Sequence, residues 1–577
     1  MMELLHKFKH AKLLRWFTDP SVSWRMPLAI FILIFLTGFM GAAQTGLFDR
    51  DEPRNAQAAR EMIETGNWLV PTFNGEPRLH KPILIYWLMA LSYKLLGVTA
   101  LAARMPSIIA GSLSGVVVYL FANKWFGRRV AIWSLIVWAT VPLTLVESRM
   151  ATTDALLNLL ILGMMAMLAR LYQGEGRWYA RGFWLFLGLS ILTKGPVGLL
   201  PVAGALIFTR YYAGVSLPWR FLRPLEGMTI ACVVVLPWIV AVSLATDGEF
   251  LRFAVGREML GRTIRPAEGH WGLPGYYLLM LPLMFFPWIA FLPMALKKSW
   301  CERKTDPRIA FLIGWAALPL VPLELMATKL VHYHYPSYAA LAILVGREIT
   351  RLEPLLLRPN LLEGGRFLRG SFISMCGLAA AFFLATAFVA SWVVSIGSLL
   401  AASVLVYGLY RMIPLFQSGQ WRKVIPVLAW TWVAVLILTL AWVLPAGKRR
   451  AITHNVAKSL KRHAEELQAT AILGEFREPS LIFELQATEP VVISRKLSDL
   501  RTIARNKGAL VVPVLEKDLA IMKKAGDLEV TVVDQVSAFD FQQGRRRKVG
   551  LALVTLRPEE RLADLRELID GQRSVIR

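Results

Sequence analysis

Long apolar blocks separated by short polar links run along residues 1–446. A helix needs about 20 apolar residues to cross the hydrocarbon core of a bilayer. The blocks therefore predict about 13 transmembrane helices. The predicted spans lie at residues 27–47, 103–121, 130–147, 155–171, 183–193, 196–209, 226–245, 275–296, 309–327, 336–347, 371–392, 395–411 and 424–445.

The links between the spans predict the orientation of the chain. Residues 83–97 are too short for a comfortable span and contain Lys94, so we expect an amphipathic helix at the membrane interface. With the N-terminus inside and this segment left out of the count, the Lys- and Arg-rich links fall on the cytoplasmic side, as positive-inside anchoring requires. The opposite, periplasmic side receives the first outer loop, residues 48–102, several later links and everything after residue 446.

The composition changes at about residue 447, where short β-like runs alternate with helical stretches. This pattern predicts a small extracytoplasmic α/β domain over 447–577, following a transmembrane domain over 1–446. Within it, we expect strands near 471–476, 490–495, 509–515, 529–536 and 549–556. The basic run Arg545–Lys548 is predicted to form a turn.

Composition supports a polytopic membrane protein. Of 577 residues, 55% are hydrophobic and only 18% charged, and the mean hydropathy is +0.48. The net charge of +25 does not indicate nucleic-acid binding, because Lys and Arg fall mainly in the short links and the C-terminal tail. The three cysteines, Cys232, Cys301 and Cys376, have no pairing or zinc-like spacing.

The first outer loop carries an unusual cluster of carboxylates. Asp49, Asp51 and Glu52 lie within four positions at the end of the first predicted span. Charge is costly near a bilayer, so such a cluster indicates a functional site. The alternative is a solvated helix cap, since the loop then predicts a short helix over 54–65.

Later outer links carry further candidates. Asp154 precedes an apolar helix, where its alternative role is helix capping. Four arginines, among them Arg257 and Arg262, accompany His270 in the link 246–274 and indicate an anion ligand, with a solvated loop as the alternative. The segment 326–338 holds Lys329 and two histidines, but no nearby carboxylate completes a metal site.

These groups together favour a transferase that uses a donor embedded in the membrane. A carboxylate such as Asp51 or Asp154 serves as a general base for a hydroxyl or amine acceptor. Lys and Arg side chains hold a phosphate and stabilise it as a leaving group. The candidate cations are Lys81, Arg257, Arg262 and Lys329. Composition alone does not separate a transferase from a transporter.

Several motifs resemble, in order, those of membrane GT-C glycosyltransferases. The first outer loop matches through Asp51–Arg54 (DEPR), Ala58–Met62 (AAREM), Gly66–Trp68, Asn74-Gly75 and Lys81-Pro82 with Tyr86-Trp87. The later matches are Ala151–Leu156 (ATTDAL), Leu192–Gly198 (LTKGPVG), Leu236–Trp238, Gly269–Tyr277 (GHWGLPGYY), Phe286–Trp288 and Thr328–Pro336 (TKLVHYHYP). The resemblance covers about residues 25–350. It is to the branch that holds the lipid A aminoarabinose transferases and the dolichyl-phosphate-mannose protein mannosyltransferases.

The resemblance implies a GT-C fold and roles for individual residues. Asp51 would be the principal catalytic carboxylate, with Asp154 second and Glu52 beside it. The donor phosphate would be held by Lys81, Arg262, Arg257, Lys329, Tyr333 and Tyr335. The acceptor or sugar would meet His80, Arg54, His270 and Tyr86. The resemblance implies no required metal or other cofactor.

Two departures from the family bear on specificity. His80 stands where relatives often have Glu, and Arg257-Glu258 stands where they often have a Glu/Asn-His pair. Aminoarabinose and lipid A are therefore not carried over as substrates. The predicted function is an inverting glycosyltransferase of the bacterial inner membrane that moves a sugar from polyprenyl phosphate to an envelope glycolipid or protein. A transporter or flippase of a lipid-linked sugar is the alternative, and an assembly scaffold is a third.

Overall fold

The computed structural model describes most of the chain and divides it into two compact units. The described residues are 25–48, 51–174, 176–217, 219–261, 271–355, 365–389, 392–418, 420–448, 452–474, 476, 478–487, 489–494, 497–523, 528–540 and 545–557. The first unit comprises residues 1–43, 62–71 and 77–444, and the second comprises 44–61, 72–76 and 445–577. Sequence reasoning did not anticipate that the first outer loop is divided between both units.

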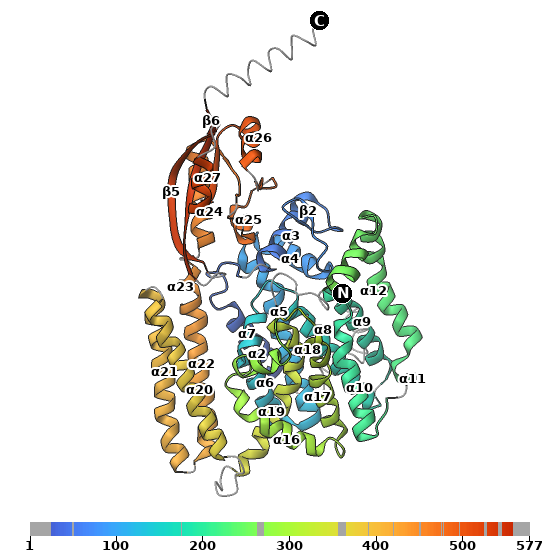
Figure 1. Cartoon of the computed structure of the whole chain (residues 1–577). Helices are drawn as coiled ribbons and strands as arrows, with labels where there is room; N and C mark the ends of the chain where they lie inside the picture. The colour runs from blue at the N-terminus through green and yellow to red at the C-terminus, as the bar shows by residue number, and fades with distance from the viewer. Residues whose placement is uncertain are drawn as a thin grey trace. The chain divides into compact units, whose positions relative to one another are not determined.

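The first unit is a bundle of helices (Figure 1). Its earlier helices are α2 (Arg25–Phe39), α4 (Leu84–Leu96), α5 (Ala100–Phe126), α6 (Arg128–Thr140), α7 (Pro142–Glu147), α8 (Asp154–Tyr172), α9 (Arg177–Lys194), α10 (Leu199–Ala213), α11 (Trp219–Leu222) and α12 (Pro224–Ala245). Its later helices are α13 (Glu249–Leu251), α15 (Tyr276–Met284), α16 (Leu292–Glu302), α17 (Pro307–Ala317), α18 (Leu320–Leu325), α19 (Tyr338–Leu355), α20 (Gly365–Val389), α21 (Trp392–Gln417) and α22 (Trp421–Leu438). Irregular helical turns occupy Pro196–Gly198, Arg252–Gly261, Trp288–Phe291, Val331–Ser337 and Thr439–Val443.

Many of these helices are apolar enough to cross a membrane. Seven in the described part of the chain pass a test of length and composition, and the bent pair Tyr276–Met284 and Trp288–Glu302 raises the total to eight. The prediction of an apolar, mostly helical chain is thereby confirmed. Several predicted spans are broken, however. Residues 130–147 form two helices because Pro142 cannot donate to the preceding turn, and 275–296 bends by 117°.

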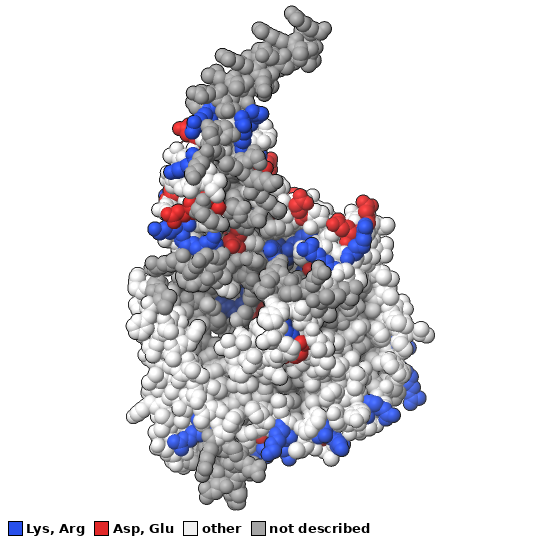
Figure 2. Space-filling model, in the orientation of Figure 1, with Lys and Arg blue, Asp and Glu red and all other residues white. Residues whose placement is uncertain are grey.

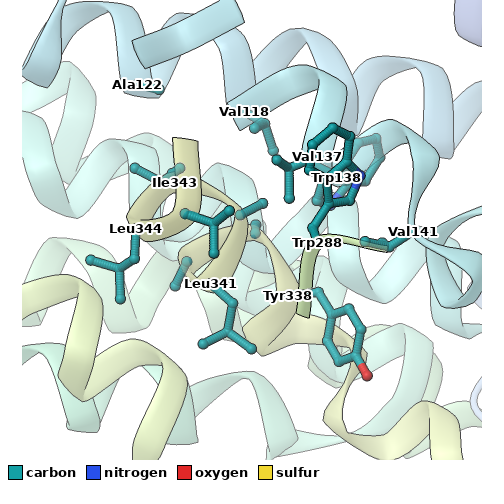
Figure 3. Close-up of a cluster of buried hydrophobic side chains, with 14 of the residues drawn as sticks. Val118, Ala122, Val137, Trp138, Val141, Trp288, Tyr338, Leu341, Ile343 and Leu344 are labelled. Carbon is teal, nitrogen blue, oxygen red and sulfur yellow. The ribbon is translucent and has the colours of Figure 1, made fainter. Parts of the chain in front are cut away.

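The core of this unit gathers where α5, α6 and α19 meet (Figure 3). Trp138 and Trp288 are fully buried there. Trp288 donates its indole N–H to the Thr140 hydroxyl at 2.8 Å, and Trp432 of α22 donates to the Thr140 carbonyl at 2.8 Å. A hydrogen bond to a buried indole N–H is favourable, so these bonds help to set how α6, α22 and the Trp288 turn meet.

Helix α4 has the amphipathic character predicted for residues 83–97. Its buried face includes Tyr86 and Met89, whereas Leu91, Leu95 and Leu96 are 53%, 74% and 52% exposed. Lys94 lies 4.5 Å above the Trp68 ring. An apolar face open to its surroundings, flanked by Trp and Lys, is typical of a helix lying in the headgroup region.

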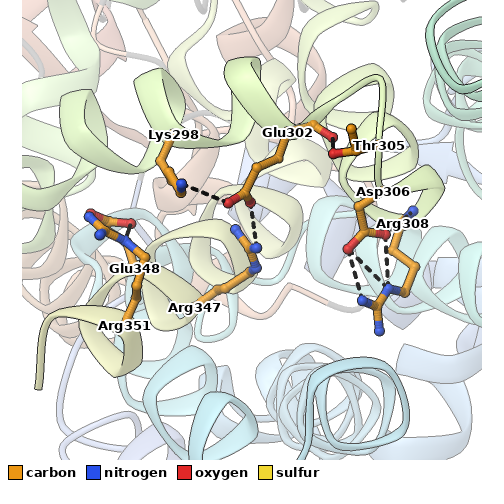
Figure 4. A network of polar contacts seen from close by, with 8 residues as sticks. All are labelled: Lys298, Glu302, Thr305, Asp306, Arg308, Arg347, Glu348 and Arg351. Atoms are coloured by element: carbon orange, nitrogen blue, oxygen red, sulfur yellow. Dashed lines mark hydrogen bonds and ion pairs between the residues drawn. The ribbon is translucent and has the colours of Figure 1, made fainter. Parts of the chain in front are cut away.

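Charged side chains collect at one end of the helical unit, below a broad band of uncharged surface (Figure 2). A network joins α16 and α19 there: Glu302 accepts from Lys298 at 3.1 Å and also pairs with Arg347 (Figure 4). Glu348 and Arg351 form a further pair, as do Asp306 and Arg308. These residues belong to or flank the basic links predicted from the sequence.

The second unit contains a four-stranded mixed sheet in the order β3-β4-β6-β5. Its strands are β3 (Thr470–Ala471), β4 (Leu510–Leu515), β5 (Leu528–Asp540) and β6 (Arg545–Leu556), and its helices are α24 (Ile452–Glu466), α25 (Pro479–Leu485), α26 (Leu497–Lys507) and α27 (Glu516–Lys523). Strand β4 pairs parallel with β3 and antiparallel with β6. Alternate β4 residues enter opposite cores: Val511 packs with α24, and Val512 packs with α26 and α27.

Some details of the predicted strands are wrong. Of the described residues within 471–476, β3 includes only Ala471. The run Arg545–Lys548 is not a turn but the start of β6, paired with Ser537–Asp540. Residues 490–494, the described part of another predicted strand, form no regular strand, and Ile493 makes an isolated bridge to Leu473.

Helices α10 and α17 of the first unit approach each other very closely. A Cβ atom added to Gly204 would lie 2.1 Å from the Gly314 carbonyl oxygen, and the reverse holds for Gly314. Helices in lipid gain little from the hydrophobic effect against each other, so close backbone packing through small residues contributes much of their association.

We predict that Gly204→Val separates these helices and lowers the melting temperature of the detergent-solubilised protein. Overpacking a tight contact costs about 1–3 kcal/mol. Gly377→Val in α20 is the matched control, because a Cβ there meets nothing within 4 Å. Equal melting temperatures for the two variants would show that the close contact is not needed for stability.

Candidate functional site

The first unit places an ion pair where two helices meet. Asp154 is the first residue of α8 and Lys194 the last residue of α9. The Lys194 Nζ atom lies 2.5 Å from Asp154 Oδ1. Both side chains are nearly enclosed, at 14% and 8% exposure. A buried pair of this kind holds both groups in their charged forms.

Local sequence explains why the charges lie at these helix ends. A carboxylate is favourable at a helix N-terminus and an ammonium group at a C-terminus, since each opposes the helix dipole. Gly195, with φ at +77°, ends α9 and its N–H group bonds the Ile191 carbonyl. The capping alternative for Asp154 is not what the structure shows, because no side chain caps α8 at its N-cap residue, Thr153.

Further polar side chains surround this pair. The Lys194 ammonium lies 4.9 Å from the centre of the Tyr333 ring. Lys81 also acts electrostatically on the Asp154 carboxylate, as does His332 when it is protonated. His332 also lies 4.0 Å from Glu147, which ends α7 and is 4% exposed. The structure thus brings together Asp154, Lys81 and Tyr333, three of the residues predicted from the sequence.

The segment 326–338 is more deeply buried than its polar sequence suggests. Lys329 donates to the carbonyls of Leu323 at 3.0 Å and Glu324 at 2.8 Å, and its side chain is 1% exposed. Burial lowers the pKa of His334 to about 4, so this imidazole is neutral at pH 7. Tyr335 is fully buried, and burial raises the pKa of its hydroxyl.

A second small cluster forms around Phe253. The ring of His80 meets the Phe253 ring edge-on at 4.8 Å. The Arg257 guanidinium lies 5.3 Å from the centre of the same ring. His80 and Arg257 therefore share one aromatic neighbour. Tyr86, in contrast, is fully buried and accepts from Arg78 at 3.2 Å.

The carboxylates of the first outer loop lie on helix α3 (Asp51–Thr65), which confirms the predicted short helix and starts three residues earlier. Asp51 is in the first turn and partly exposed. Glu52 is buried, and its Oε2 accepts from the Phe48 N–H at 2.5 Å, which ties the start of α3 to the residues that precede it. Arg54 is partly exposed on the same helix.

Some predicted residues lie outside the described part of the chain, namely Asp49, Arg262 and His270. Within the described ranges, no three His, Cys, Asp or Glu side chains are grouped so that they could hold a metal ion.

Sequence reasoning missed Lys194, Glu147 and His332 as site residues. Lys194 stood inside a quoted motif, and a lysine at the end of an apolar helix should have been assigned an acidic neighbour. Glu147 could have been found in the same way, because it is a carboxylate at the end of an apolar segment. His332 was considered only as a metal ligand, although an imidazole beside a carboxylate can also accept or donate a proton.

Comparison with known proteins agrees with this architecture. Residues 80–240 match the family model described as dolichyl-phosphate-mannose-protein mannosyltransferase. A structural neighbour is ArnT from Cupriavidus metallidurans, solved in complex with undecaprenyl phosphate. Its TM-score is 0.72 at 20% sequence identity, and the match covers 91% of this chain and 97% of ArnT. This chain therefore has the same fold as ArnT.

Curated proteins that are similar to this chain share one name. The undecaprenyl phosphate-alpha-4-amino-4-deoxy-L-arabinose arabinosyl transferase of Aeromonas salmonicida is 32% identical over 328 residues, covering 56% of this chain and 59% of the relative. The protein of that name from Pectobacterium atrosepticum is 30% identical, covering 61% and 64%. The sequence matches thus span less than two thirds of these relatives' own length. The resemblance to this glycosyltransferase branch is confirmed.

We predict that Lys194→Met lowers the free energy of unfolding by about 3–5 kcal/mol, because it leaves the buried Asp154 carboxylate without its counter-charge. The double variant Asp154→Asn/Lys194→Met should lose less than the two single variants add up to. Thermal or denaturant unfolding in detergent measures both quantities.

Lys298→Met provides the control for loss of a lysine, since Lys298 is 41% exposed in its pair with Glu302 and such a pair contributes at most about 1 kcal/mol. Additive effects of the two single substitutions would contradict a direct Asp154–Lys194 interaction.

Proposed function

We propose that this protein is an inverting glycosyltransferase that moves a sugar from polyprenyl phosphate to an envelope acceptor. The observation that carries the proposal is the ArnT fold, matched over 97% of the ArnT chain, combined with the enclosed charged cluster around Asp154 and Lys194. The named activity of the arabinosyl transferases that resemble this chain supports the same reaction class. The solved ArnT complex supports undecaprenyl phosphate as the lipid carrier.

The two aspartates take different roles in this proposal. Asp154 is held as a carboxylate by Lys194 at 2.5 Å, and a carboxylate in such a pair is a weak proton acceptor. Asp51 is partly exposed in the first turn of α3. We therefore assign the general base to Asp51, and to Asp154 the positioning of the Lys194 and Tyr333 side chains.

The proposed reaction is a single displacement. Asp51 accepts the proton of an acceptor hydroxyl or amine, whose oxygen or nitrogen attacks the anomeric carbon of the sugar. The bond between that carbon and the phosphate oxygen breaks, and polyprenyl phosphate leaves. The configuration at the anomeric carbon inverts, because attack and departure occur on opposite faces.

Cations would stabilise the leaving phosphate. Lys81, Arg257 and Arg262 are assigned to this task, with the Tyr333 hydroxyl as a further donor. Lys329 is assigned instead to holding its own loop, since its ammonium group already bonds two carbonyl oxygens and approaches Glu324. No metal is needed for this mechanism.

We propose that the chain is oriented in a bacterial inner membrane with its N-terminus in the cytoplasm. The charged network of α16 and α19 would then face the cytoplasm, which agrees with the positive-inside rule. The first outer loop and the C-terminal α/β region would be periplasmic. About 13 crossings remain the predicted number, counting short and broken helices.

The acceptor is assigned only to the class of envelope glycolipids or proteins. His80 and Arg257 flank Phe253, and both differ from what relatives often have. We infer that this cluster contributes to the choice of sugar or acceptor.

The first experiment measures free polyprenyl phosphate by mass spectrometry. Purified protein in liposomes receives a mixed extract of polyprenyl-phosphate sugars and envelope acceptors. Wild type should release polyprenyl phosphate, and Asp51→Asn should slow the release by about 10²–10⁴-fold, because an amide cannot accept the proton. The mass gained by the acceptor identifies the sugar.

Glu64→Gln is the matched control, since it removes an exposed carboxylate from the far end of the same helix. Transport of labelled donor across the bilayer without release of polyprenyl phosphate would replace the proposal by a transporter. Unchanged release by Asp51→Asn would reject Asp51 as the base.

A further inference from the structure

Glu61 holds a tight turn in the first outer loop. It is 8% exposed and lies on α3, ten residues after Asp51. Its carboxylate accepts four hydrogen bonds, from Gln57 Nε2 at 2.8 Å, Thr72 Oγ1 at 2.7 Å, Asn74 N at 2.7 Å and Gly75 N at 3.2 Å. Such charge-assisted bonds are stronger than neutral ones. The Asn74-Gly75 turn between β1 (Thr72–Phe73) and β2 (Glu76–Pro77) is thereby fixed to α3.

The same turn is bonded to the C-terminal region. Asn74 donates from Nδ2 to the Val491 carbonyl at 2.9 Å and accepts at Oδ1 from the Val491 N–H at 2.7 Å. This pair of hydrogen bonds has the same pattern as the two bonds that facing residues exchange in an antiparallel β-sheet. A Cβ on Gly75 would lie 3.0 Å from Pro490, so the turn is in close contact with Pro490 and Val491.

Two further contacts extend this junction. Arg60 of α3 donates from a guanidinium nitrogen to the Ala487 carbonyl at 2.9 Å. Phe73 packs into the core cluster that contains Leu481, Leu485 and Val491. The hairpin therefore contributes an apolar side chain to the C-terminal core as well as polar bonds to its edge.

Geometry connects this junction with Asp51. The ten residues from Asp51 to Glu61 span about 15 Å of helix axis. A tilt of about 4° at Glu61 would therefore displace Asp51 by about 1 Å. A misplacement of that size can slow an enzymatic reaction by about 100-fold.

We propose that Asn74 is a positioning residue through which the segment 487–491 of the C-terminal region sets the direction of α3 and so the place of Asp51. The C-terminal region then acts as a support for the catalytic loop. The part of this inference that concerns catalysis rests on the proposed function, whereas the support of α3 does not.

The test substitution is Asn74→Gly in the full-length protein in lipid nanodiscs. Asn74 has φ at +56°, so glycine removes the side chain without straining the backbone. Hydrogen–deuterium exchange is followed for residues 53–65 and 487–493. Loss of two hydrogen bonds should raise exchange about 10-fold or more in both segments.

Asn67→Ala is the matched control. The Asn67 Oδ1 atom accepts from the N–H groups of Leu69 and Val70, both at 3.1 Å. This variant also loses two loop hydrogen bonds, but none of them is to the C-terminal region. Its exchange over 487–493 should equal that of wild type.

Activity supplies the second readout. Asn74→Gly should lower kcat about 10-fold or more and leave KM for the donor unchanged, since it disturbs the base and not the residues assigned to the donor phosphate. Asn74→Asp should raise exchange and lower kcat in the same way. Aspartate tolerates the same backbone conformation, but it places an oxygen against the Val491 carbonyl.

Two results would overturn the proposal: faster exchange in 487–493 with α3 unchanged, or faster exchange in both segments with kcat unchanged. If wild type transfers no sugar, the proposed function fails, and the exchange of α3 alone decides whether Asn74 supports the helix.

Discussion

The Asp154–Lys194 pair constrains how the helices around it are arranged. Two charges this deeply enclosed are stable only in each other's presence, because either one alone carries a large desolvation cost. The start of α8 and the end of α9 must therefore stay together. Tyr333, His332 and Glu147 then gather around a fixed electrostatic centre. The candidate site is thus part of the packing of the helix bundle. The helix dipoles at these ends stabilise both charges and offset part of the free energy lost when the charges leave water.

The second unit applies a different constraint. Its sheet buries alternate residues of β4 in two separate cores, with helices on both faces. The hairpin of the first outer loop adds Phe73 to one of these cores and bonds its edge through Asn74. A loop that bears catalytic candidates is thereby ordered by a structure about 400 residues later in the chain. Function placed on loops generally needs such a rigid support.

Much of the architecture was predictable because it follows from local chemistry. Apolar blocks, the short helix after Asp51-Glu52 and the amphipathic segment 83–97 all appeared near the expected places. Helix breaks were less predictable, since Pro142 divides a block that hydropathy alone treats as continuous. The buried state of Lys329 and Tyr335 was not foreseen either. The burial of a side chain depends on which distant segments pack against it. It therefore cannot be predicted from the polarity of the segment that contains the side chain.

The sequence by itself determined that this is a mostly helical membrane protein, and its ordered motifs established the resemblance to the GT-C glycosyltransferase branch. Those properties depend on the hydropathy and spacing of residues that are close together in the sequence. Only the tertiary structure decided that Asp154 pairs with Lys194, that His80 and Arg257 share Phe253, and that Asn74 bonds Val491. Each of these contacts joins residues far apart in the chain, and it forms only once helix packing and sheet pairing have set the distance between them.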